Sequence, residues 1–121
     1  MRFMFIWKPG KAISGPPSPE THQRLQALIE EGKKSGKFLG TDGLINGPNG
    51  ARVQRKKDGT FKITDGPYTE TKELVAGYAI MRLANKAAAI EEAKRFLDIM
   101  KETGDEGVSE VHEMYDDGSR A

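Results

Sequence analysis

The chain has 121 residues, a size typical of one domain, and no cysteine, which excludes disulfides, thiolate metal ligands and a cysteine nucleophile. Its formal net charge is +1, from 19 basic and 18 acidic residues that are interspersed along the chain, so we expect no nucleic-acid partner. No apolar run approaches the roughly 20 residues of a membrane span, and the apolar start is too short for a signal peptide. We therefore expect one domain over residues 1–121, in the cytoplasm and not in a membrane.

The first half of the chain predicts a strand, a helix and a second strand. Residues 3–7 are apolar on both faces, which is typical of a strand that is covered on both sides. A loop rich in Gly, Pro and Ser follows, and a helix is expected over residues 19–35, with Ser18 as its N-cap and Gly36 at its end. Residues 38–40 and 44–45 indicate a second strand that glycine interrupts.

The second half predicts a hairpin and then the same strand, helix and strand. Asp58-Gly59 is a strong hairpin signal between strands expected at residues 51–56 and 60–64. The segment 74–83 is again apolar on both faces. Asn85 caps a helix expected to run to about Thr103, before Gly104, and its apolar side chains recur with helical period. The remaining expected elements are a strand at 108–115 and a frayed polar tail at 116–121.

This order of elements predicts an α+β domain of the ferredoxin-like type, with both helices on one face of an antiparallel sheet. The second face of such a sheet has no helices, yet residues 3–7 and 74–83 are apolar on that face too. A large exposed apolar face predicts a partner surface. We therefore expect a homodimer whose two sheets pack through the helix-free face.

One loop and the strand after it resemble a known family. The segment Asp65-Gly66-Pro67-Tyr68 continues through Glu70, Lys72 and Glu73 to Gly77-Tyr78. This pattern is similar to the signature of the DGPF group of YCII-related proteins, and the likeness extends over nearly the whole chain. The resemblance implies the dimeric α+β barrel superfamily, the fold that the pattern of elements also predicts.

The resemblance also implies a catalytic pair. YCII-type proteins carry a histidine and an aspartate proposed to be catalytic, and some relatives are lyase-like dehalogenating enzymes. His22 in the first helix matches that histidine, and Asp65 is a candidate for its partner because it opens the signature loop. Many relatives have arginine where this chain has His112, so an anion-binding arginine does not carry over. Members of the DGPF group are often linked to extracytoplasmic-function sigma factors.

Each of these residues also has a plain structural interpretation. An imidazole suits proton transfer near neutral pH, but His22 at the margin of a helix's apolar stripe can equally be a surface histidine. Asp65 can simply fix the turn through its own backbone. The polar loop residues Tyr68, Glu70 and Lys72 are either rim residues for a ligand or an ordinary solvated segment.

Three further candidates lie on expected strands. Tyr78 belongs to the doubly apolar strand, so its ring is expected in the core with its hydroxyl bonded to one partner; the alternative is a hydroxyl that points into a cleft and contributes to ligand binding. Glu110 and His112 alternate around Val111 and share the face toward the barrel or the dimer. They can act as ligand-binding groups or form an interfacial salt bridge. No His-x-His or His-x-x-x-His spacing occurs, so no metal is expected, and the absence of phosphate-binding motifs predicts no nucleotide cofactor.

Two classes of function stay open at this stage. The first is a small-molecule enzyme, a lyase or isomerase without cofactor that uses His22 and Asp65 as an acid–base pair. The second is a dimeric ligand-binding or accessory module without catalysis, linked to sigma-factor regulation. A catalytic function requires the imidazole and a carboxylate to converge on a pocket, whereas a binding module requires only the pocket.

Overall fold

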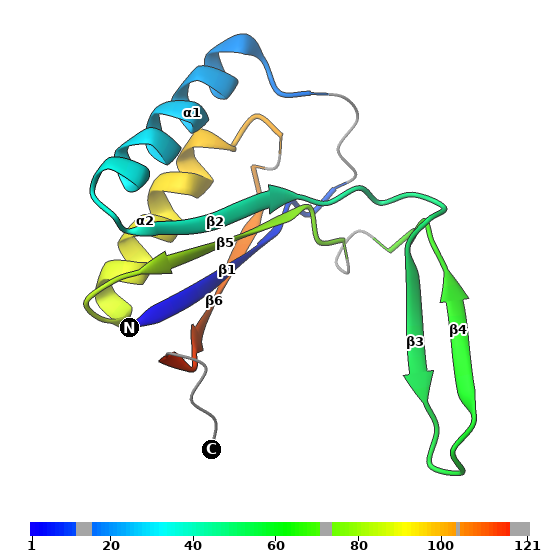
Figure 1. Ribbon diagram of the computed structural model, residues 1–121. Coiled ribbons are helices and arrows are strands. Elements are labelled where there is room, and N and C mark those ends of the chain that lie inside the picture. The colour runs from blue at the N-terminus through cyan, green and yellow to red at the C-terminus, as the bar shows by residue number, and fades with distance from the viewer. Residues whose placement is uncertain (12–15, 71–73, 104, 117–121) are drawn as a thin grey trace.

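A computed structural model describes residues 1–11, 16–70, 74–103 and 105–116. Its main element is a four-stranded antiparallel sheet in the order β2-β5-β1-β6. The strands are β1 (Arg2–Lys8), β2 (Phe38–Gly43), β5 (Gly77–Arg82) and β6 (Val108–Met114). Helices α1 (Pro19–Lys34) and α2 (Lys86–Ile99) cover one face of this sheet (Figure 1). This is the expected α+β arrangement of ferredoxin-like type.

Local sequence signals set the starts of both helices. The Ser18 side chain accepts a hydrogen bond from the Thr21 backbone N–H at 3.2 Å, and the Asn85 side chain accepts one from the Ala88 N–H at 2.9 Å. Each cap therefore satisfies one of the N–H groups that a helix leaves unpaired in its first turn. After α1, Gly36 takes a positive φ of 75°, a conformation that glycine adopts without a steric penalty.

The core lies between the helices and the alternate residues of β1 and β5. Phe3, Phe5 and Trp7 are buried on the helix side of β1, while Met4 and Ile6 on the other face are only half-buried. Phe3 pairs with Met81 in the neighbouring strand, and these residues belong to one core cluster. The other members are Phe5, Leu83, Ala89 and Ala93. The helix-free face is therefore the less covered face of the sheet in a single chain.

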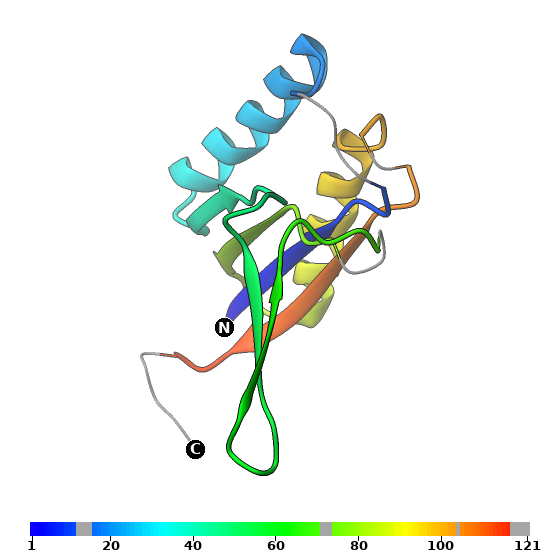
Figure 2. The same cartoon turned by 90° about the vertical axis from the view of Figure 1, so that its right-hand side faces the viewer.

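The hairpin of β3 (Ala51–Arg55) and β4 (Phe61–Asp65) forms a separate two-stranded sheet. It joins the domain near the ends of β2 and β5 and projects on the side away from the helices (Figures 1 and 2). Every residue of β3 is exposed, and so are all residues of β4 except Thr64. The hairpin is thus an arm that no part of the four-stranded sheet covers.

Most expected elements are present, with shifted boundaries. The expected strand at residues 44–45 is wrong: β2 is a single strand from Phe38 to Gly43, with a shift in its pairing to β5 between Phe38 and Gly40, and Ile45 is 94 % exposed. The chain leaves the sheet there to enter the hairpin, so the apolar character of Leu44-Ile45 does not mark a strand. The strand expected at 74–83 is shorter, because Leu74 is buried but lies ahead of β5. The expected stop at Gly104 and most of the tail, residues 117–121, lie outside the described residues.

Candidate functional site

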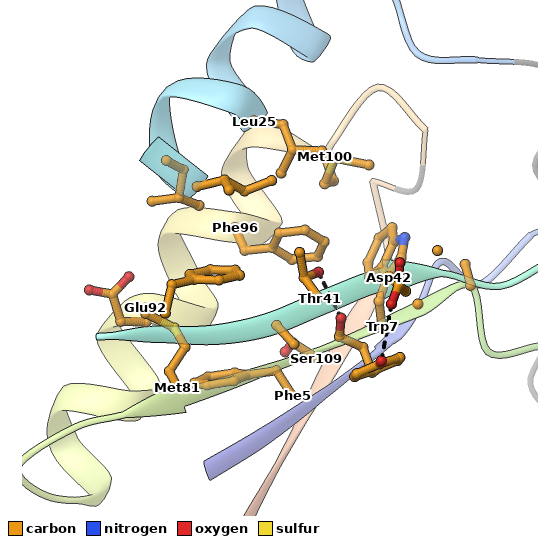
Figure 3. Close-up of a pocket in the computed structure, with 18 residues that line it drawn as sticks. Phe5, Trp7, Leu25, Thr41, Asp42, Met81, Glu92, Phe96, Met100 and Ser109 are labelled. Atoms are coloured by element: carbon orange, nitrogen blue, oxygen red, sulfur yellow. Dashed lines mark hydrogen bonds between the residues drawn. The ribbon is translucent and has the colours of Figure 1, made fainter. Parts of the chain in front are cut away.

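A cavity of about 240 Å³ lies between the two helices and the sheet (Figure 3). Its walls are mainly apolar and include five aromatic rings, those of Phe5, Trp7, Phe38, Tyr78 and Phe96. The Trp7 and Phe96 rings stand edge to face, with centroids 5.2 Å apart and an interplanar angle of 84°, a favourable geometry for aromatic pairs. The other apolar lining side chains include Leu25, Leu28, Ile29, Met100, Ala79 and Met81, and the polar residues Glu92 of α2 and Ser109 of β6 also line the cavity. Such a lining suits an apolar ligand.

The polar lining of the cavity is concentrated where β2 pairs with β5. Asp42 lies directly opposite Tyr78, and the Tyr78 hydroxyl donates a hydrogen bond to Asp42 Oδ2 at 3.2 Å. The Thr41 hydroxyl donates to the Tyr78 carbonyl at 2.8 Å. The hydrogen bond to the Asp42 carboxylate raises the pKa of the Tyr78 hydroxyl above its ordinary value, so the phenol stays protonated at neutral pH.

The same pair connects the cavity with the helix-free face of the sheet. Asp42 and Tyr78 both line the cavity, but the strand register places their side chains on the face opposite Ala79 and Met81. The Tyr78 hydroxyl has thus found a partner, as expected, although Tyr78 is half-buried at this edge and not part of the helix-side core. Asp42 and Tyr78 therefore border both the cavity on the helix side and the helix-free face of the sheet.

A second polar group lies across the helix-free face. Ile6 pairs with Tyr78 on one side and with Glu110 on the other, so these three side chains share a face. Lys8 Nζ donates to Glu110 Oε2 at 3.1 Å, and His112 Nε2 lies 3.4 Å from Glu110 Oε1. Glu110 and His112 thus share the helix-free face, since they pair with Ile6 and Met4, and their alternation around Val111 predicts a shared face.

The pH dependence of stability should report the Lys8–Glu110 contact. The hydrogen bond from Lys8, followed by the one from His112, holds the pKa of Glu110 below its ordinary value near 4.5. A lowered carboxyl pKa contributes stability above the ordinary pKa, and this contribution is lost as the pH falls through the lowered pKa. Replacing Lys8 with methionine should therefore lower the melting temperature at pH 7, with a difference that shrinks between pH 5 and pH 3.

Melting curves of both proteins across that range give the measurement. Lys37→Met is the control, because Lys37 forms no ion pair within the described residues. A difference between Lys8→Met and the parent that stays constant from pH 7 to pH 3 would contradict the expected role of Glu110.

The signature loop is held by the turn ahead of the hairpin. The Asn46 amide donates to the Tyr68 carbonyl at 2.9 Å and accepts from the Tyr68 N–H at 2.9 Å, and the Gly66 N–H donates to the Gly50 carbonyl at 2.8 Å. The Arg52 guanidinium lies 4.9 Å from the centroid of the Tyr68 ring, within cation–π range. Glu70 is exposed, and Lys72 lies outside the described residues. The loop therefore has a fixed backbone over residues 66–68.

The structure does not join His22 to Asp65 within one chain. His22 is exposed in the first turn of α1, where its backbone N–H bonds to the Ser18 carbonyl, and its side chain is not half-shielded as expected. Asp65 is exposed at the end of β4, in the separate hairpin sheet. Among the described residues no hydrogen bond or ion pair connects them, and neither lines the cavity. Their pairing stays a prediction.

Sequence reasoning missed Asp42, Thr41 and Lys8. Asp42 and Lys8 reach Tyr78 and Glu110 only through strand pairing, across 36 and 102 positions of the chain. No spacing in the sequence marks such contacts. Within the described ranges, no three His, Asp or Glu side chains are grouped as metal ligands would be, and no helix is long and apolar enough to cross a membrane.

Comparison with known proteins identifies the family of the chain. No curated protein matches the chain at a significant level. The family model of the YCII-related domain matches residues 1–99, which include both helices, five of the six strands and the whole signature loop. The match covers well over half of the sequence, and the chain therefore belongs to the YCII-related family.

Proposed function

We propose that this protein binds a small, mainly apolar molecule in the cavity between its helices and its sheet. The observation that carries the proposal is the cavity itself, about 240 Å³ with aromatic walls and a polar end. An apolar space of about 150 Å³ is known to accept benzene, so this one has room for a substituted aromatic ring. Pockets that are largely apolar with few polar groups are typical of small-molecule sites.

The polar end indicates which substituent the ligand carries. Asp42 accepts the Tyr78 hydroxyl with Oδ2, and its Oδ1 has no hydrogen bond from any described residue. A carboxylate oxygen accepts hydrogen bonds and attracts positive charge. The proposed ligand class is therefore an aromatic or alkyl body with one hydrogen-bond donor, an amine or an alcohol, and not a carboxylic acid.

Fluorescence of the single tryptophan tests the proposal, since Trp7 lines the cavity. Three probes with the same body, phenethylamine, 2-phenylethanol and phenylacetate, should be titrated, with calorimetry as a second readout. The amine should bind about tenfold more tightly than the acid, because its charge complements Asp42. Asp42→Asn should remove most of this preference.

A substitution that fills the cavity is compared with the same substitution outside the cavity. Ala79 lines the cavity, whereas Ala87 is exposed on α2 and does not. Ala79→Leu should weaken all three probes, and Ala87→Leu should leave them unchanged. No saturable signal with any probe, or equal binding by Ala79→Leu and the parent, would remove the proposal.

Catalysis by His22 and Asp65, as a cofactor-free lyase or isomerase, is the second candidate. Family membership supports it, through the likeness of His22 to the first-helix histidine of YCII-type proteins. For a binding module, His22→Ala should change the affinity for the three probes by less than twofold, since His22 does not line the cavity.

The proposed protein is a homodimer of the DGPF group in the cytoplasm. Half-buried Met4, Ile6 and Ile80 on the helix-free face support a homodimer through that face. The signature Asp65-Gly66-Pro67-Tyr68 supports placement of the chain in the DGPF group. Placement in that group in turn supports a link to sigma-factor regulation. The cytoplasmic location stays a prediction from the sequence.

A further inference from the structure

The β3–β4 hairpin has two dissimilar faces. In its register Val53 pairs with Ile63 and Arg55 with Phe61, so one face carries three large apolar side chains. Val53, Phe61 and Ile63 are each at least 63 % exposed. Arg52 and Lys62 lie on the other face. A two-stranded hairpin is marginally stable in water without a surface to pack on, which indicates that this arm packs against something.

Charge is unbalanced in two segments of the chain. The hairpin, residues 51–64, contains five basic residues and one acidic residue, a net charge of +4. Residues 105–116, which include β6, contain five acidic residues and no lysine or arginine, a net charge of −5. Two of the five are paired within the chain, Glu110 with Lys8 and Asp116 with Arg2 and Arg82, so Asp105, Glu106 and Glu113 carry the charge that a partner would meet. Both helices, by contrast, balance their charges: each of α1 and α2 carries three acidic and three basic residues.

β6 also offers a free edge. It is the last strand of the order β2-β5-β1-β6, so its outer backbone groups have no strand partner among the described residues. Glu106 and Glu113 in this segment are exposed and form no ion pair with any described residue. An exposed edge is a template for an additional strand.

We propose that the hairpin of one copy docks along the β6 segment of a second copy. The hairpin projects on the helix-free side of the sheet (Figure 2), the side on which the homodimer proposed above places the second copy. A twofold axis makes the contact reciprocal, because each copy supplies one basic hairpin and one acidic edge. Two such contacts close the dimer and leave neither charged segment exposed. This inference rests on the proposed homodimer and not on the proposed ligand.

Charge reversal with rescue tests the contact. Lys57→Glu with Lys62→Glu takes the net charge of the hairpin from +4 to 0, and Glu106→Lys with Glu113→Lys takes that of residues 105–116 from −5 to −1; all four residues are exposed. Sedimentation equilibrium should show that each double variant associates at least tenfold more weakly than the parent at low salt. A mixture of the two variants should regain part of the association, because the mixed dimer restores one contact between a parental hairpin of charge +4 and a parental edge of charge −5. Added salt should weaken the parent dimer.

Apolar substitutions give a second, charge-independent test. Ile63→Ser, on the apolar face of the hairpin, should weaken association, whereas Ile45→Ser should not, although Ile45 is even more exposed at 94 %. Circular dichroism should show native secondary structure for the hairpin variants, since the hairpin lies outside the four-stranded sheet.

The outcomes separate this inference from the homodimer through the sheet face. Ile80→Lys places a charge in the middle of the helix-free face. If Ile80→Lys abolishes the dimer while the hairpin variants associate as the parent does, the arm contact is wrong and the sheet-face dimer stands. If the hairpin variants dissociate and Ile80→Lys does not, the arm contact stands and the sheet-face dimer is wrong. A parent protein that is monomeric at 100 µM, or a mixture without rescue, would overturn the inference; probe binding at the cavity is unaffected by either result.

Discussion

Replacing Leu83 with alanine is expected to destabilise the protein by about 2–5 kcal/mol. Leu83 follows β5, is 6 % exposed and belongs to the core cluster with Phe3 and Ala89. Truncation removes apolar atoms from this cluster and leaves a cavity that the surrounding sheet and helix can fill only in part. Because domains of this kind are stable by only about 5–15 kcal/mol, the change removes a large share of the total stability.

Urea unfolding followed by circular dichroism measures the effect as a lower midpoint at unchanged slope. Leu39→Ala is the matched control, since Leu39 lies at the irregularity in the β2–β5 pairing and is 48 % exposed. The free energy of unfolding of Leu39→Ala should stay within about 0.5 kcal/mol of the parent value, as for most surface substitutions. Equal losses for the two variants would show that Leu83 is not in the core.

Replacing Gly32 with valine should destabilise the protein by about 2–3 kcal/mol. Gly32 is buried in α1 against β2, and a Cβ atom there would lie 2.7 Å from Cδ2 of the Phe38 ring and 3.1 Å from its Cβ. Phe38 packs against the core cluster and lines the cavity, so its ring cannot move without disturbing both. The helix must therefore separate from the strand. Glycine and valine differ by only a few tenths of a kcal/mol in helix propensity, so the loss reports packing.

The control for this variant is Gly40→Val. A Cβ atom at Gly40 meets no atom within 4 Å, and its φ is not positive. Valine is also favourable in strands, so the stability of the Gly40→Val variant should be equal to that of the parent or slightly higher. Because Gly32 sets the distance between α1 and the cavity wall, Gly32→Val should also alter the affinity for phenethylamine. A variant with parental stability and parental affinity would contradict the role of this glycine.

Local signals made much of the fold predictable. Ser18 and Asn85 cap helices because their side chains reach N–H groups three positions ahead, a contact that depends on the neighbouring sequence alone. The double apolarity of residues 3–7 correctly identified a central strand, because β1 pairs on both sides. Such features follow from propensity and period.

The candidate site could not be predicted in the same way. Alternation placed Glu110 and His112 on one face, but which residues lie beside them depends on the pairing register, which alternation does not specify. Asp42 became part of the site only because it lies opposite Tyr78. The hairpin's turn was evident from Asp58-Gly59, whereas its position apart from the main sheet was not, since that position depends on where the chain leaves β2.

The central place of β1 has a consequence for how the chain folds. The first strand in sequence order lies between β5 and β6, so Arg2 pairs with Arg82 on one side and with Met114 on the other. Both neighbours are synthesised long after β1. The entropy cost of closing these long loops must therefore be met before the contacts between the strands stabilise the sheet. During translation Phe3, Phe5 and Trp7 therefore leave the ribosome before either partner strand has been made, so β1 can take its place in the sheet only after β5 and β6 have been synthesised.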